Sequence, residues 1–192
     1  MKVRVVGISG SPRKGGNTDT LLDRALKGAA SEGAAVEKTF LNDLAFKPCQ
    51  ECGGCYKTGV CVFHDDMRHV YKSIERADSV IIASPVFFGT VTAQLKAMID
   101  RFNCLWIAKY VLKKRILHKK SRKGYFLCAS GLQARRHFVD ARKVVRNLFA
   151  TLDIKYAGEL FCGGLEDRGA VKTDMKAMKK AFMLGKASAR AI

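Results

Sequence analysis

Four of the chain's seven cysteines lie within one short segment, CQECGGCYKTGVC, which covers residues 49–61. Thiols this close in sequence can form disulfides, bind zinc, act as a redox pair or hold an iron–sulfur cluster. The odd number of cysteines argues against a disulfide framework. The N-terminal sequence also lacks the long apolar run of a signal peptide, so we expect a cytoplasmic protein whose thiols stay reduced.

The spacing C-x2-C-x2-C-x5-C favours an iron–sulfur cluster among these possibilities. Three cysteines two residues apart can surround three corners of a [4Fe–4S] cubane, and a fourth follows shortly after. A structural zinc site usually has two cysteine pairs separated by a longer stretch, and a catalytic dithiol needs only two cysteines. Zinc and metal-free thiols remain the alternatives. The candidate metal ligands are Cys49, Cys52, Cys55 and Cys61.

A second segment with chemical potential is SGSPRKGGNT, at residues 9–18. Its glycines allow a tight backbone path, its hydroxyls and Arg13 can contact an anion, and free N–H groups of a predicted helix follow at once. These features predict a phosphate-binding loop. The loop is not a Walker A motif, because Gly16 takes the place of the lysine, and it does not match the dinucleotide pattern G-x-G-x-x-G.

Two more segments carry residues that suit an aromatic ligand. SPVFFGTVTAQLK places Phe87 and Phe88 in a predicted loop, where adjacent rings either cover the end of a sheet or stack on a planar ligand. CASGLQARR offers Ser130 and Gly131 after another strand. Together with the phosphate-binding loop, these segments favour a flat heteroaromatic phosphate ester, and we therefore expect FMN.

The elements that position these loops are strands and helices in alternation. Apolar runs rich in β-branched residues predict five strands. They lie at residues 2–9, 34–41, 77–85, 124–130 and 154–162. Between and after the strands, apolar residues recur at three- and four-residue spacing and predict helices. Asn17 or Thr18 is expected to cap the first helix, and Asp65 or Asp66 the second.

This alternation indicates an α/β protein with a parallel sheet covered on both faces. We expect a flavodoxin-like three-layer sandwich with strand order 2-1-3-4-5, formed by one domain over residues 1–192, with a cysteine-rich loop at 47–65. Ligands of such sheets bind at the carboxyl ends of the strands, near the switch between strands 1 and 3. The cysteine loop follows the second strand, so we expect it beside the same crevice.

The charge of the chain is strongly positive. Its 192 residues contain 35 Lys and Arg against 17 Asp and Glu, which gives a net charge of +18. Many of these cations lie in KYVLKKRILHKKSRKGY, residues 109–125. We interpret this basic segment first as a solvated connection, second as a docking surface for an acidic electron carrier such as a ferredoxin, and last as a nucleic-acid site. No segment is long enough to span a membrane.

The three motifs taken together resemble the iron–sulfur flavoproteins, within the larger group of NADPH-dependent FMN reductase-like proteins. The resemblance runs through about residues 1–104 and continues more weakly to the end, where GLEDRGAVK also fits. It implies that the cysteine segment holds a [4Fe–4S] cluster. It also implies homo-oligomers, dimers or tetramers, in which the cluster of one subunit approaches the flavin of another.

The resemblance carries individual roles onto this sequence. The FMN-phosphate site maps to Ser9, Ser11, Arg13, Asn17 and Thr18, and the isoalloxazine site maps to Pro85, Val86, Phe87, Phe88 and Gly89. Relatives often have tyrosine at the position of Phe87, so this chain lacks that hydroxyl.

The implied function is that of an electron-transfer protein that converts between one- and two-electron steps. A cluster-free NAD(P)H-dependent FMN or quinone reductase is the alternative, and a basic module that binds zinc through its cysteines is the third. No nicotinamide motif is visible, although NAD(P)H can donate electrons by stacking on a flavin.

Overall fold

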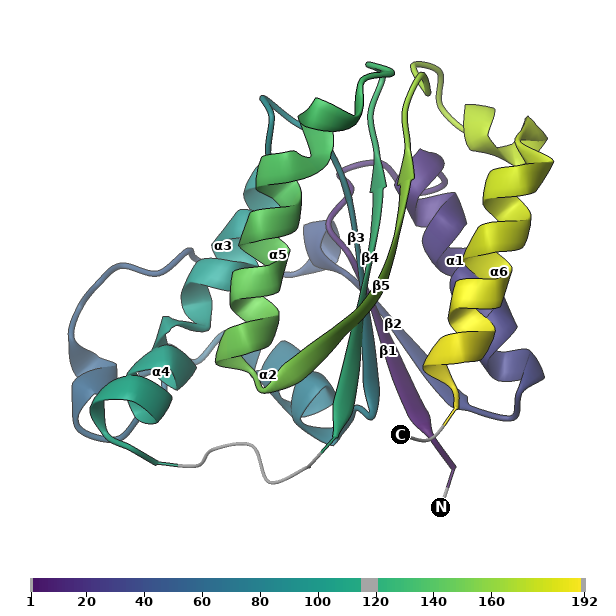
Figure 1. Cartoon of the computed structure of the whole chain (residues 1–192). Helices are drawn as coiled ribbons and strands as arrows, with labels where there is room; N and C mark the ends of the chain where they lie inside the picture. Colours follow the sequence, from purple (N-terminus) through teal and green to yellow (C-terminus); the bar gives the residue numbers. More distant parts are fainter. Residues whose placement is uncertain (1, 115–120, 191–192) are drawn as a thin grey trace.

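The computed structural model of the chain describes residues 2–114 and 121–190. Within them, helices cover both faces of a five-stranded parallel sheet (Figure 1). The strands are β1 (Arg4–Ser9), β2 (Ala35–Phe40), β3 (Ser79–Pro85), β4 (Arg122–Ala129) and β5 (Ile154–Cys162). Their order is β2-β1-β3-β4-β5, and every neighbouring pair is parallel. The predicted flavodoxin-like fold is therefore confirmed.

The helices occupy the predicted places between the strands. They are α1 (Asn17–Ser31), α2 (Met67–Arg76), α3 (Ala93–Arg101), α4 (Asn103–Trp106), α5 (Val139–Thr151) and α6 (Met175–Ser188). Shorter helical turns are η1 (Leu41–Asp43), η2 (Gly54–Tyr56), η3 (Ile107–Val111), η4 (Arg135–Phe138) and η5 (Ala170–Thr173). No helix in the described parts of the chain is both long and apolar enough to cross a membrane.

The sheet separates two hydrophobic cores. Helices α2, α3 and α5 pack on one face, and α1 and α6 pack on the other. Side chains of a strand point to opposite faces, so neighbouring residues of β1 alternate between the cores. Val5 lies in the core under α1 and α6, and Val6 lies in the core under α2, α3 and α5. The helix pair α1 and α6 approaches so closely that a Cβ atom on Gly185 would lie 1.8 Å from the carbonyl oxygen of Ala25.

The described part of the basic segment 109–125 includes the exposed Lys113 and Lys114, which suit a solvated connection, and cations with partners at its two ends. Strand β4 begins at Arg122, which is 1% exposed. Its guanidinium donates to the carbonyl oxygens of Ile74, at 3.1 Å, and of Leu152. Burial lowers the pKa of Arg122. Lys109 is paired with Asp153 at 2.6 Å. Arg122 is therefore a structural residue of the buried sheet end, Lys109 forms a partly exposed ion pair, and residues 115–120 lie outside the described part of the chain.

Candidate functional site

Loops at the carboxyl ends of β1, β3, β4 and β5 surround a cavity of about 250 Å³, at the upper end of the sheet in Figure 1. We call this cavity the switch-point pocket. The predicted residues that line it are Ser11, Arg13, Asn17, Thr18, Pro85, Val86, Phe87, Ser130 and Gly131. The structure does not bring Ser9, Phe88 or Gly89 to its wall.

Ser9 supports the first loop from below. Its buried hydroxyl donates to Asp19 at 2.9 Å, and the second carboxylate oxygen of Asp19 accepts the N–H of Gly15 at 2.8 Å. Burial alone would raise the pKa of Asp19, but hydrogen bonds from Lys38, Gly15 and Ser9 lower it. The ionised carboxylate therefore fixes the curved backbone of the loop, and Ser9 acts through Asp19.

The first turn of α1 is open to the pocket. Its N-cap residue is Gly16, and no side chain caps it, contrary to the prediction for Asn17 or Thr18. Helix N–H groups in a first turn have no intrahelical partner, so an anion can accept from them. Arg13 is exposed beside this turn and takes part in none of the ion pairs found among the described residues. Uncapped N–H groups and an unpaired cation suit a phosphate.

Asn17 connects two loops. Its side-chain nitrogen donates to the carbonyl oxygens of Leu165, at 3.2 Å, and Asp167, at 2.8 Å. Its side-chain oxygen accepts the N–H of Val171 at 3.1 Å. All three partners lie in the segment after β5. The side-chain amide of Asn17 therefore positions this wall of the pocket. The sequence analysis predicted a direct contact with the phosphate and did not include this role.

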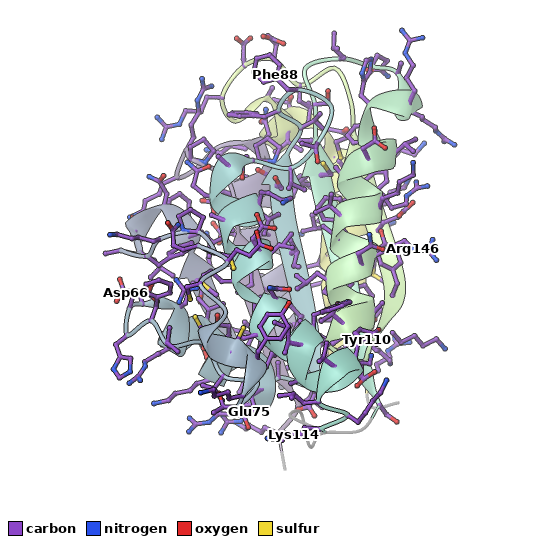
Figure 2. The ribbon with its side chains drawn as sticks, turned by 90° about the vertical axis from the view of Figure 1, so that its left-hand side faces the viewer. Asp66, Glu75, Phe88, Tyr110, Lys114 and Arg146 are labelled. Carbon is purple, nitrogen blue, oxygen red and sulfur yellow. The ribbon has the colours of Figure 1, made fainter. Side chains whose placement is uncertain are left out.

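The loop after β3 forms a tight hairpin turn. Phe87 and Thr90 exchange backbone hydrogen bonds at 2.9 and 3.0 Å, and the two residues between them have positive φ, 48° for Phe88 and 81° for Gly89. Such a conformation is strained for a bulky residue. The turn holds the fully exposed Phe88 at its tip (Figure 2), and this residue does not line the pocket. Phe87 is the ring that reaches the pocket wall.

Thr92 ties the loops after β1 and β3 together. Its hydroxyl donates to the carbonyl oxygen of Gly10 at 2.6 Å and accepts the N–H of Leu95 at 3.3 Å, which caps α3. A Cβ atom on Gly10 would lie only 2.8 Å from the Cβ of Leu95, so the two loops meet without room for a larger residue. The sequence carried a signal for this residue, since threonine before an apolar helical stripe is a typical N-cap.

The loop after β5 supplies residues that the sequence prediction missed. Leu165, Glu166 and Arg168 line the switch-point pocket. Arg168 donates to the carbonyl oxygen of Lys14, and the Glu166 carboxylate covers Gly131, where a Cβ atom would lie 2.1 Å from Oε2. The same rule that selected the other loops, their place after a strand, could have found these residues in GLEDRGAVK.

The cysteine loop, residues 47–65, lies apart from this pocket. Cys49 lines a second cavity of about 360 Å³ together with Ile99, Trp106 and Leu148. Ile99 and Leu148 belong to the C-terminal halves of α3 and α5, which extend toward the lower end of the sheet in Figure 1. The expectation that the loop lies beside the flavin crevice is therefore wrong within one chain.

The four cysteines of the loop are near one another. Burial raises the pKa of the Cys55 thiol, and the neighbouring Cys49, Cys61 and Cys52 raise it further. Among the described residues, however, no three His, Cys, Asp or Glu side chains converge as a metal site. The donor set is four thiols, which fits an iron–sulfur cluster in its chemistry. The remaining cysteines, Cys104, Cys128 and Cys162, are buried, as predicted.

Arg101 closes the base of the cysteine loop. It ends α3 and is 1% exposed. Its terminal nitrogens donate to the two carboxylate oxygens of Asp65 at 2.5 and 3.0 Å, and Nη1 also donates to the carbonyl oxygen of Lys47 at 2.8 Å. Lys47 and Asp65 are the two ends of the loop. One buried side chain therefore holds both ends, and we call this arrangement the Arg101 clamp.

Neighbouring groups reinforce the clamp. The Arg101 guanidinium lies 5.2 Å from the centre of the Phe63 ring. Burial raises the pKa of the Asp65 carboxyl, but the hydrogen bonds and charge of Arg101 outweigh it, so the pKa is lowered overall. Of the two predicted caps of α2, the Asp65 side chain accepts the N–H of Met67, the first residue of the helix, at 3.2 Å, whereas Asp66 accepts the N–H of Ala45 at 2.7 Å. This contact is a second closure just outside the first.

The fold is that of the flavodoxin-like class. Residues 3–163 match the NADPH-dependent FMN reductase family, and the chain belongs to it. The chain is 38% identical to an iron–sulfur flavoprotein of Methanosarcina thermophila over 59% of this chain and 60% of that protein. It is 46% identical to an iron–sulfur flavoprotein of Archaeoglobus fulgidus over 52% of this chain and 45% of that protein. The match thus spans about half the length of these curated relatives.

Solved structures support the same fold. An FMN-dependent NADH-azoreductase from Bacillus anthracis, solved in complex with FMN, aligns with 98% of this chain and 100% of its own at a TM-score of 0.73. The sequence identity is 14%, so this likeness extends to the fold alone. The resemblance found in the sequence is confirmed at the level of the family.

The clamp predicts a coupled effect on stability and on loop order. We expect Arg101→Met to lower the free energy of unfolding by about 3 kcal/mol, because it leaves a carboxylate and a carbonyl without their buried partner. Trypsin should then cleave faster at Lys57, an exposed site inside the loop. Urea unfolding and limited proteolysis measure the two effects.

The matched control is Arg68→Met, which removes an exposed arginine from α2.

The clamp also predicts a pH dependence, because the pKa of Asp65 is lowered in the folded state. The pair of Arg101 and Asp65 stabilises the protein above the unfolded pKa near 3.8, and this stabilisation is lost as the pH falls through the folded pKa. Arg101→Met should flatten that acid-side dependence. Equal stability and equal cleavage of both variants would disprove the clamp.

Proposed function

We propose that this protein is a flavin-dependent oxidoreductase that transfers electrons between FMN in the switch-point pocket and a [4Fe–4S] cluster in the cysteine loop. The observation that carries the proposal is the combination of two features in one chain. A four-cysteine loop is clamped onto the fold of the FMN reductase family, and a pocket with an open helix N-terminus lies at the carboxyl ends of the strands.

The residues of the pocket fit FMN. The N–H groups at the start of α1, with Ser11, Thr18 and Arg13, would hold the phosphate, and Arg168 adds a second cation at the same wall. Residues 85–87 would contact the isoalloxazine ring. Ser130 and Gly131 would border its other edge, where a side chain at residue 131 would displace the Glu166 carboxylate.

Cys49, Cys52, Cys55 and Cys61 would hold the cluster. Flavin exchanges two electrons as hydride or one at a time, whereas a cluster passes single electrons, so together they convert between the two. The task of this chain is to position both groups, through the Arg101 clamp at the cluster and the linked loops at the flavin. NAD(P)H is the proposed electron donor, and an acidic carrier such as a ferredoxin is the proposed acceptor.

The alternative is a cluster-free NAD(P)H-dependent FMN or quinone reductase. Among the described residues the cysteine side chains do not converge on one point, and this arrangement is compatible with a reductase that has no cluster. Iron and sulfide analysis separates the two functions, because they share the flavin site and differ only in the cysteine loop.

We also propose that the working unit is a homo-oligomer, a dimer or a tetramer. Within one chain the cysteine loop lies to the side, beyond α3 and α4, whereas the switch-point pocket lies at the upper end of the sheet (Figure 1), and the cavities at the two places share no lining residue. Pairing of subunits can bring the loop of one to the pocket of another and cover an exposed cluster. Trp106, which lines the same cavity as Cys49, and the neighbouring Tyr110 (labelled in Figure 2) are 44% and 41% exposed and are the proposed contact residues.

The first prediction from this function concerns the cluster. Protein purified without oxygen should contain about four iron and four sulfide per chain, and Cys52→Ser should lose most of both. Cys162→Ala, at a buried cysteine outside the loop, is the control and should keep them. Iron and labile-sulfide assays measure this. Stoichiometric zinc without sulfide would contradict it, and iron-free protein that keeps FMN would favour the alternative.

The second prediction concerns the flavin phosphate. FMN should bind well and riboflavin poorly, because the proposed contacts at the start of α1 recognise the phosphate. A charge-assisted contact contributes roughly 1.5–3 kcal/mol, so Arg13→Ala should weaken FMN binding about ten- to a hundredfold. Fluorescence titration measures both affinities. Arg68→Ala is the control, and equal affinity for FMN and riboflavin would rule out the phosphate site.

The third prediction concerns assembly. Light scattering should detect an oligomer, and Trp106→Glu should weaken it, because a charge would be buried in the contact. Val36→Glu, at a similarly exposed residue on β2, should leave assembly unchanged. The dissociated Trp106→Glu protein should reduce its cluster through FMN more slowly. A monomer that reduces its cluster at the normal rate would refute electron transfer between subunits.

A further inference from the structure

A basic groove runs along the open edge of the sheet, apart from the switch-point pocket and the cysteine loop. β5 is the last strand in the sheet order, so within residues 2–114 and 121–190 no strand neighbours its outer backbone groups. Helices α5 and α6 flank it on the two faces (Figure 1). The groove between them has a volume of about 890 Å³. We call it the β5 groove.

The walls of the β5 groove carry uncompensated positive charge. Arg135 and Arg142 line the side of α5, and Lys176, Lys179 and Lys180 line the side of α6. The acid that lines the groove, Glu159, is already bound by Arg142 at 2.7 Å and by the Tyr156 hydroxyl at 2.5 Å. The three lysines take part in none of the ion pairs found among the described residues. Lys176 and Lys180, one turn apart, repel each other.

The floor of the groove is apolar. Phe138 and Phe161 stack with ring centres 4.9 Å apart, and the Arg142 guanidinium lies 5.0 Å over the Phe161 ring. Met183, 50% exposed, adds flexible apolar surface from α6. The groove therefore combines three features, which are an unpaired strand edge, basic walls on both sides and an apolar floor.

We propose that the β5 groove binds an acidic, extended segment of a partner protein, which adds to β5 as a sixth strand. A peptide backbone satisfies the strand edge, and its alternating side chains would face the two basic walls in turn. Charge complementarity selects an acidic segment.

Two other occupants fit less well. A second copy of this chain would bring two basic grooves together across a symmetric contact, where like charges repel. Single-stranded nucleic acid needs exposed rings for base stacking, and the Phe161 ring is already stacked on Phe138 and covered by Arg142.

The probe for this proposal is a labelled ten-residue peptide, acetyl-Glu-Glu-Val-Thr-Glu-Glu-Val-Thr-Glu-Glu-amide, which presents glutamates on both faces of an extended strand. We expect it to bind the purified, cofactor-loaded protein in fluorescence anisotropy at low salt. Replacing glutamate by glutamine should weaken binding at least tenfold. Replacing the first threonine and the second valine by proline keeps the charge and removes one N–H from each edge of the extended peptide, so a ladder bond to β5 is lost in either register and binding should weaken as much.

The protein variants form a matched pair with equal change in net charge. Lys176→Glu with Lys180→Glu alters the groove, and Lys27→Glu with Lys72→Glu alters exposed lysines of α1 and α2. We expect at least a tenfold loss of peptide binding in the groove variant and less than twofold in the control. If the glutamate pair fails to fold, Lys176→Gln with Lys180→Gln replaces it and should lose binding in the same direction.

Three results would overturn the proposal. An equal loss in both double variants would mean that bulk charge alone attracts the peptide. Full binding of the proline peptide would exclude strand addition. Groove-dependent binding of a ten-residue oligothymidylate or of ADP-ribose 2′-phosphate, without binding of the acidic peptide, would assign the groove to a phosphate-bearing ligand. Flavin and iron contents of the groove variants should stay unchanged whichever result is found, so the test is independent of the proposed electron-transfer function.

Discussion

The buried pair of Arg101 and Asp65 is the contact on which the cysteine loop depends. A glycine-rich loop with four thiols has little apolar surface of its own, so burial cannot order it. The guanidinium orders it instead, because its planar donors reach the Asp65 carboxylate and the Lys47 carbonyl at the same time. Lysine could not do this, since a single ammonium lacks the fork geometry. The loop is thereby fixed to the end of α3 rather than to the sheet.

The switch-point pocket follows a similar logic on the other side of the molecule. Its walls come from loops that are far apart in sequence, and single polar side chains join them. Thr92 joins the loops after β1 and β3, and Asn17 joins the loops after β1 and β5. Each of these residues also lies at the start of a helix. Residues at helix starts therefore serve twice, because they begin a helix and also fix a neighbouring loop.

The sequence was sufficient for the fold and for most of the pocket wall, and the reasons are local. A buried parallel strand such as β3 is a continuous apolar run, and a helix after a glycine-rich loop has a clear start. The sequence was insufficient where a partner lies far along the chain. Arg101 has the appearance of a surface cation on a short helix, and its ties to Lys47 and Asp65 span 54 and 36 residues. The prediction that Phe88 lines the pocket failed for another reason. The turn that points this residue outward depends on positive φ at two successive residues.

The positive charge of the chain acquires a different meaning once it is placed in the fold. Arg101 and Arg122, each 1% exposed, are structural, and neither is available to a partner. Lys109 is paired with Asp153, so the described part of the basic segment is less free than its composition suggests. Among the cations with no ion pair in the described residues, Arg13 lies at the switch-point pocket and three lysines of α6 line the β5 groove. Both places also offer unpaired backbone N–H groups, at a helix start and at a strand edge. Positive charge and free backbone donors coincide there, and this coincidence separates a binding surface from a merely solvated one.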